Sequence, residues 1–356
     1  MRHPTFLFLL NLAKKISAFA LAGLILALAC SAYLLSASSQ SRPRTTSQSN
    51  IGAGGPDEVV KVDVDLITID ALVLQKQTAR VVGDLQKGDF ILSEDGVNQT
   101  ITHFGQDTLP LSVLLLVDRG GCLDPFGTEV RAAARDAIAH LKATDEIALM
   151  TYHNDVELLQ PFTRDRFRIS EALDRVPPHD EQAQHCLNKA FFDAADYIQS
   201  AGNPIGRRVI VAITGVTRDF DCPGGPSSKT ASQAVYESGA VVSAIIPKSG
   251  EQQMENGFMR WATRIGKLGG APYIDIQTLA NETGGEILQD KPENLDTTFA
   301  TLIDHLRTRY NLAFVSSNKK RDGTTRKLKI EMAPTAQKSK GKLVVKARRS
   351  YVAPRS

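Results

Sequence analysis

Apolar runs that alternate with helical stretches fill the middle of the chain, and they restrict its fold more than any other feature. The runs lie at residues 112–117, 146–152, 208–214 and 241–246, with a shorter one at 286–288. Segments with helical spacing lie between them near 128–141, 166–176, 189–200 and 229–237, and two more follow near 274–283 and 294–310. Because strands that alternate with helices form βαβ units, we predict an α/β fold with a doubly wound, mostly parallel sheet covered by helices on both faces.

β patterns flank this α/β segment on both sides. Apolar residues recur with a period of two from Val59 to Val73, and short strand-like segments continue to Phe104. Three more strand-like segments follow the α/β part, at 311–316, 326–332 and 342–345. We predict that the N-terminal and C-terminal strands pair into a flanking β-sandwich-like domain.

An uncharged run at residues 16–35 follows Arg2, Lys14 and Lys15. Its length matches the roughly 20 residues that a helix needs to cross a bilayer. Positive charge before it predicts that the rest of the chain is exported. The small residues at 36–38 favour cleavage of a signal peptide, whereas the length of the run favours a retained membrane anchor, and both remain open. Residues rich in Ser, Thr, Gln and Gly follow up to Pro56, as in a flexible linker.

Charge and short motifs exclude several function classes. The 42 basic and 39 acidic residues leave a net charge of only +3, which gives no case for nucleic-acid binding. The chain has no nucleophile elbow, zinc-peptidase helix, P-loop or dinucleotide fingerprint. We therefore expect that this chain is not an enzyme. The remote alternative is a cysteine-dependent enzyme assisted by His153, His179 or His185.

The apolar run 112–117 ends in Asp118-Arg119-Gly120-Gly121-Cys122. Ligands of open α/β sheets bind at the carboxyl ends of parallel strands, so Asp118 lies where a site would be built. The strand and loop resemble the start of a von Willebrand factor type A (VWA) domain, whose Asp-x-Ser-x-Ser loop holds a divalent metal. Gly120 and Cys122 stand at the two serine positions, so this resemblance implies a degenerate metal-ion-dependent adhesion site.

The resemblance extends to VWA-related proteins of the acidobacterial type. It covers residues 85–96, which begin Leu85-Gln86-Lys87-Gly88-Asp89-Phe90, the turn Asn281-Glu282-Thr283-Gly284-Gly285, and the later motifs at 310–312 and 322–327. It implies a signal peptide or membrane anchor at 1–38, a linker at 39–56, an N-terminal β domain at 57–108, a VWA-like domain at 109–310 and C-terminal β strands at 311–356.

The other two metal loops of the family also differ here. Lys189 stands where the family has a threonine, and Gly215 follows Thr214 where the family has an aspartate. Only Asp118 of the family's ligand positions remains, and one carboxylate is a poor magnesium site. We predict no metal and no cofactor, with the Lys189 ammonium near Asp118 in place of the cation. The alternative is a magnesium or calcium site rebuilt from Asp118, Asp124, Asp219 and Asp221.

Cys122, Cys186 and Cys222 fall in three different loops around the former metal site. An exported protein meets an oxidising compartment, which favours a disulfide. Sequence alone leaves all three pairings open. We favour Cys186 with Cys222, because Cys122 occupies a tight loop position.

The segment 248–273 carries Phe258, Trp261, Ile265 and Leu268 at helical spacing, with Arg260, Arg264 and Lys267 on another side. A helix packed on its own domain is the first interpretation. Contact with lipid headgroups or a partner is the second.

These observations predict an exported adhesion or scaffold module that is anchored in the envelope or secreted and binds a protein partner. The expected contact surface is the former metal-site loops, which carry Asp118, Gly120, Cys122, Lys189, Gly215 and Asp219. In the absence of a metal, Lys189 or Arg218 would capture an acidic side chain of the partner. A metal-dependent adhesion module with the rebuilt site is the alternative.

Overall fold

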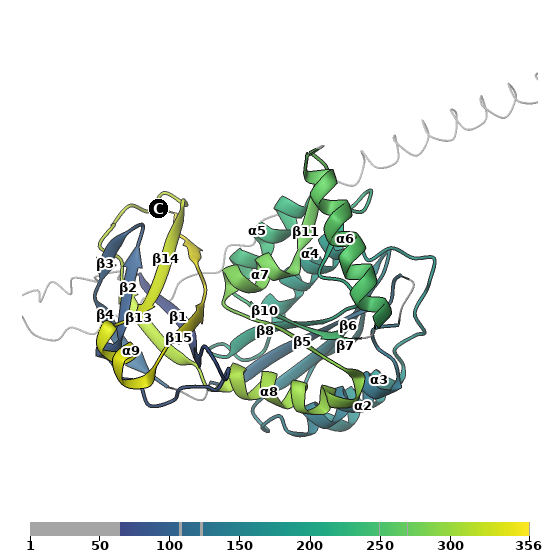
Figure 1. Ribbon diagram of the computed structural model, residues 1–356, viewed down its shortest axis with the longest axis horizontal. Coiled ribbons are helices and arrows are strands. Elements are labelled where there is room, and N and C mark those ends of the chain that lie inside the picture. Colours follow the sequence, from purple (N-terminus) through teal and green to yellow (C-terminus); the bar gives the residue numbers. More distant parts are fainter. Residues whose placement is uncertain (1–64, 107–108, 122–123, 249, 269, 356) are drawn as a thin grey trace, which may run out of the picture. The chain divides into compact units, whose positions relative to one another are not determined.

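The computed structural model describes residues 65–106, 109–121, 124–248, 250–268 and 270–355 (Figure 1). These residues belong to one unit, Val62–Ser356. The start of the predicted first strand, the uncharged run 16–35, the linker and Cys122 all lie outside the described residues.

A six-stranded sheet forms the centre of the α/β part, in the order β12-β10-β8-β5-β6-β7. Five strands are parallel to one another: β5 (Leu111–Asp118), β6 (Glu146–Tyr152), β8 (Arg207–Ile213), β10 (Val241–Pro247) and β12 (Ile287–Asp290). The edge strand β7 (Val156–Thr163) is antiparallel to β6. The predicted mostly parallel sheet is confirmed, while β7 was not predicted.

Helices cover both faces of this sheet, because its strands are apolar on both sides. In β5, Val113, Leu115 and Val117 join one core cluster, and Leu114 and Leu116 join the other. The first cluster is completed by α2 (Thr128–Ala139), α3 (Arg166–Asp174) and α8 (Leu295–Arg307). The second is completed by α4 (Leu187–Tyr197), α5 (Ser228–Ser238) and α7 (Ile276–Thr283). A strand buried on both faces in this way is typical of a parallel sheet.

Strands from both ends of the described chain pair in two antiparallel sheets. One has the order β15-β1-β13-β4 and the other the order β16-β14-β2-β3. The strands are β1 (Leu66–Gln75), β2 (Phe90–Glu94), β3 (Val97–Gln99), β4 (Ile101–Gly105), β13 (Tyr310–Val315), β14 (Thr325–Met332), β15 (Leu343–Ala347) and β16 (Ser350–Val352). They share one core, in which the rings of Phe90, Phe104 and Tyr310 contact one another. The predicted pairing of N-terminal with C-terminal strands is confirmed, and the domain boundaries stay predictions.

Short elements complete the structure. β9 (Arg218–Phe220) pairs antiparallel with β11 (Tyr273–Asp275), and the long helix α6 (Gly250–Leu268) lies between them in sequence. The remaining elements are α9 (Pro334–Lys340) and the 3-10 turns η1 (Lys87–Asp89), η2 (Ile198–Ser200) and η3 (Pro292–Asn294).

A buried ion pair joins β8 to β1. Arg207 Nε lies 2.7 Å from Asp70 Oδ2, and Arg207 Nη2 donates to Asp70 Oδ1 at 2.9 Å. The Arg207 side chain is only 1% exposed and also donates to the Leu306 carbonyl. This two-point contact fixes the first residue of β8 against the antiparallel sheet.

None of the helices in the described ranges is both long enough and apolar enough to cross a bilayer.

Candidate functional site

Asp118 is the last residue of β5, and its side chain is fully buried. Thr214, which follows β8, and the loop 180–186, which precedes α4, lie around it. The site is therefore built at the carboxyl ends of two adjacent parallel strands, where the sequence predicted it.

Hydrogen-bond donors occupy both oxygens of the Asp118 carboxylate. Oδ1 accepts the Gly120 N–H at 3.0 Å. Oδ2 accepts the Thr214 hydroxyl at 2.6 Å and lies 2.8 Å from His185 Nδ1. Since a carboxylate only accepts, His185 Nδ1 carries the proton of this bond. His185 is itself 7% exposed, so the contact is shielded from solvent.

Two glycines allow the loop 180–186 to approach Asp118. A Cβ on Gly121 would lie 2.1 Å from His185 Nε2, and a Cβ on Gly120 would lie 2.6 Å from the Gln184 carbonyl oxygen. Gly121 also has a φ of +86°, which side chains other than glycine rarely adopt. Its N–H donates to the Ala183 carbonyl at 3.0 Å. A serine at position 120 would therefore collide with the neighbouring loop before its hydroxyl could point at a metal.

Tyr152 is the last residue of β6 and is completely buried. Burial, together with the negative charge of Asp118, raises the pKa of the Tyr152 hydroxyl well above its usual value of 10.0. The hydroxyl therefore stays protonated and neutral at physiological pH.

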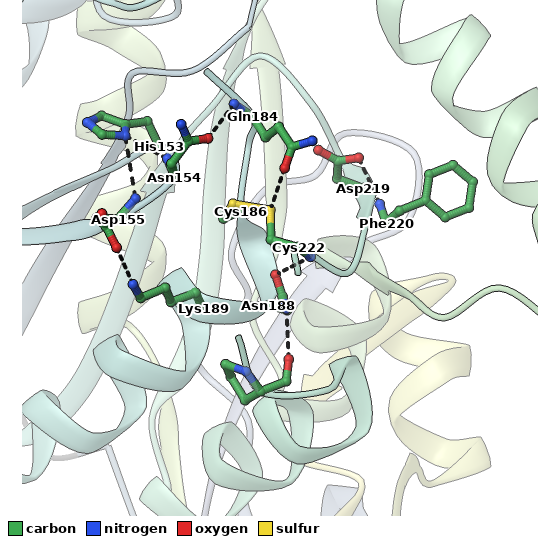
Figure 2. Close-up of a disulfide and its surroundings, with 11 residues drawn as sticks. His153, Asn154, Asp155, Gln184, Cys186, Asn188, Lys189, Asp219, Phe220 and Cys222 are labelled. Carbon is green, nitrogen blue, oxygen red and sulfur yellow. Dashed lines mark hydrogen bonds and ion pairs between the residues drawn. A yellow bond between two sulfur atoms is a disulfide. The ribbon is translucent and has the colours of Figure 1, made fainter. Parts of the chain in front are cut away.

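The predicted contact between Lys189 and Asp118 is wrong. The Lys189 ammonium bonds to Asp155, in the turn after β6 (Figure 2), and this hydrogen bond lowers the pKa of the Asp155 carboxyl. Lys189 belongs to the first turn of α4, whereas His185 lies in the preceding loop and reaches Asp118. The imidazole thus takes the place that the sequence assigned to the ammonium.

A disulfide joins Cys186 to Cys222, with a Cα–Cα distance of 5.4 Å (Figure 2). This is the pair favoured from the sequence, and it is confirmed. Cys186 is the N-cap residue of α4, and Cys222 follows β9. The fully buried Asn188 ties the same two segments, because its Oδ1 accepts the Cys222 N–H at 3.2 Å and its Nδ2 donates to the Pro226 carbonyl at 2.7 Å.

The other acidic residues proposed as ligands bond to nearby backbone groups. Asp124 Oδ1 accepts the Phe126 N–H at 2.8 Å, Asp219 Oδ1 accepts the Phe220 N–H at 2.7 Å, and Asp221 Oδ2 accepts the Ser228 N–H at 2.7 Å. In the part of the chain that the structure describes, no three His, Cys, Asp or Glu side chains gather as metal ligands would.

The loop that follows β8 and carries Gly215 and Thr217, called the third loop here, is held by α6 and β11. Asn256 Nδ2 donates to the Gly215 carbonyl at 2.8 Å, and Asn256 Oδ1 accepts the Thr217 N–H at 3.0 Å. Arg218 bonds to Asp275 at 2.6 Å, so this guanidinium, which the sequence offered as a receiver of an acidic side chain, already has a carboxylate partner.

Part of the chain is similar to a known domain family and to several solved structures. Residues 113–217 match the family model of the von Willebrand factor type A domain, and no curated protein matches the chain. Solved structures to which the chain is similar include BatB from Bacteroides thetaiotaomicron, at 14% identity and TM-score 0.38, over 55% of this chain and 98% of that chain. They also include a von Willebrand factor type A protein from Catenulispora acidiphila, at 8% identity and TM-score 0.39, over 83% of this chain and 75% of that chain. The matched segment, which runs from β5 to the third loop, is thus similar to the von Willebrand factor type A domain.

Proposed function

We propose that this chain is an exported, envelope-associated adhesion or scaffold module whose VWA domain binds a protein partner without a divalent metal. The observation that carries the proposal is the environment of Asp118. Its carboxylate oxygens already accept bonds from Gly120, Thr214 and His185.

The residues present do not fit a divalent cation. Magnesium requires near-octahedral oxygen coordination, and a cation at Asp118 would have to displace the buried hydrogen bond from His185. Neither Gly120 nor Gly215 supplies a side-chain oxygen, and the Lys189 ammonium bonds to Asp155. The Thr214 hydroxyl lies at the site, but it donates its hydrogen to Asp118 itself.

The loops around Asp118 form a surface that is already ordered. Cys186–Cys222 and Asn188 join the second loop to the third, and the bond from the Gly121 N–H to the Ala183 carbonyl joins the first loop to the second. A partner that docks on such loops loses less conformational entropy than one that must order them. Loops over a rigid sheet are also where binding residues concentrate.

Export is supported by two features. The uncharged run 16–35 has the length and the preceding positive charge of an export signal or anchor. The disulfide is of the kind that persists in oxidising compartments.

The test is thermal unfolding of the full-length chain with EDTA and with added magnesium, manganese or calcium. We expect no change in Tm for the wild type. The matched variant is His185→Ala, which frees Asp118 Oδ2 from the imidazole. A rise in Tm with metal in the wild type would refute metal-free binding.

The metal-dependent alternative has one observation in its favour. Asp221 Oδ1 is buried and has no hydrogen-bond partner in the described structure. If Asp124, Asp219 and Asp221 rebuild a site with Asp118, then Asp221→Asn would abolish any metal-induced rise in Tm. Without such a rise in the wild type, this alternative has no support.

Catalysis is not proposed. Cys186 and Cys222 are bonded to each other, so neither supplies the thiolate that a cysteine nucleophile requires. The remote enzyme alternative would depend on Cys122, which lies outside the described residues.

A further inference from the structure

Helix α6 presents an apolar stripe to solvent. Met254, Phe258, Trp261 and Ile265 recur at steps of four, three and four residues, which places them on one face. Their side chains are 75%, 61%, 60% and 49% exposed. The rings of Phe258 and Trp261 lie 5.9 Å apart and contact each other along the stripe. The helix packs on its own domain, as the first interpretation had it, but these four side chains do not make that contact.

The opposite face of α6 is the one that packs. Thr263 is fully buried, and a Cβ on Gly266 would lie 2.5 Å from the Phe220 ring. Asn256 adds the two hydrogen bonds to the third loop described above. The helix is thus fixed with its apolar stripe outward, and an exposed apolar patch of this kind marks an interaction site.

Positive charge borders the stripe. Arg260 and Arg264 are exposed, and with Trp261, Arg218 and Tyr273 they line a shallow cavity of about 460 Å³. Arg218 is neutralised by Asp275, whereas Arg260 and Arg264 have no ion pair among the described residues. Guanidinium groups beside an indole suit an anionic headgroup, because arginine bonds phosphate at two points while the ring lies in the interfacial region.

We propose that α6 docks on an anionic bilayer surface. Phe258, Trp261 and Ile265 enter the boundary between headgroups and acyl chains, and Arg260 and Arg264 bind lipid phosphates. A second copy of α6 would bring the same basic edge to the contact, so a negatively charged surface is the better complement.

The length of the segment that precedes the described residues is compatible with docking of α6 on a bilayer. Residues 36–64 separate the predicted membrane segment from the described part. The linker predicted at residues 39–56 would, as a flexible chain, have a root-mean-square span of about 23 Å. A domain tethered so close to a bilayer meets it at a high effective concentration, so even a single amphipathic helix would suffice for docking.

Trp261 is the only tryptophan of the chain and reports directly on the stripe. The full-length chain is reconstituted in nanodiscs of phosphatidylglycerol or of phosphatidylcholine, each with and without brominated acyl chains. We expect a blue shift of the Trp261 emission and quenching by bromine in the anionic discs only. Since one arginine near an anionic surface contributes about a fivefold preference, Arg260→Gln with Arg264→Gln should lower the docked-to-undocked ratio about 30-fold.

A second pair of variants tests the apolar contact of α6 with the bilayer. Phe258→Ser should abolish the quenching, while Phe167→Ser, which removes an equally large ring that is 71% exposed on α3, should leave it unchanged. All of these side chains are exposed, so equal Tm values would show that the fold is intact. Absence of quenching in both lipids, or equal quenching in both, would overturn the proposal. A blue shift that grows with protein concentration in lipid-free detergent would overturn it in favour of a second copy.

Discussion

Loss of the Cys186–Cys222 bond should destabilise the α/β part more than any single loop substitution. The two residues are 36 positions apart. Cross-linking a loop of that length removes about 13 cal/mol/K of chain entropy from the unfolded state, which is about 4 kcal/mol at 25 °C. For a protein of this size each kcal/mol corresponds to about 2 to 4 °C, so the Tm should fall by roughly 8 to 16 °C.

The assay compares denaturant unfolding of four proteins: the wild type, Cys122→Ser, the double variant Cys186→Ser with Cys222→Ser, and the triple variant. Reductant should lower the stability of the wild type and of Cys122→Ser by the same amount, and should not affect the double variant. The Cys122→Ser protein controls for thiol exchange with the third cysteine. A loss below about 1 kcal/mol would mean that Asn188 and the backbone bonds alone hold the loops. A reductant effect that persists in the double variant would refute the pairing.

Three further substitutions test other parts of the structure. Gly121→Ala adds a Cβ 2.1 Å from His185 Nε2, at a residue whose φ is +86°. The free energy of unfolding, measured in urea, should fall by at least about 1 to 2 kcal/mol. An unchanged free energy would contradict the close contact between Gly121 and His185. Arg207→Met leaves the Asp70 carboxylate without its buried partner and should cost about 3 to 5 kcal/mol, part of which Asp70→Asn should restore in a double-mutant cycle. Burial by itself would raise the pKa of Glu286, but the hydrogen bond from His305 and the charges of His305, Lys346 and Arg309 outweigh it and lower the pKa from 4.5. The carboxyl of Glu286 therefore binds a proton more readily in the unfolded chain. The stability that Glu286 contributes is present above pH 4.5 and is lost as the pH falls through the lower pKa of the folded state. Glu286→Gln should therefore flatten the acid side of the plot of unfolding free energy against pH.

The α/β part was predictable because its strands are buried on both faces. Every residue of β5, β6 and β10 is buried, and such strands appear in sequence as short, nearly continuous apolar runs between helical periods. The alternation in β14 likewise reflects one face that packs on a core and one that does not, whereas β1 is buried on both faces from Ala71 to Leu74.

The elements that sequence missed are those without such a pattern. β7 is half-exposed along its length and contains Pro161, which is compatible only with an edge position. α9 is short, and Ala336 is its only buried residue. His305, in the last turn of α8, is 6% exposed and lies 2.7 Å from Glu286 Oε1. Its partner precedes β12, and nothing local in the sequence indicates that pairing.

The site shows the same division between local and distant information. Asp118 and the glycine and cysteine that follow it could be seen in one loop, but the imidazole that bonds to Asp118 comes from His185, 67 residues away. Gly120 and Gly121 are small because Gln184 and His185 need the space above them, and the disulfide begins at the very next residue, Cys186. The two glycines, the imidazole and the disulfide are therefore parts of one arrangement. A serine at position 120 would not by itself create a cation site, because its Cβ would lie 2.6 Å from the Gln184 carbonyl oxygen and the loop 180–186 would first have to shift.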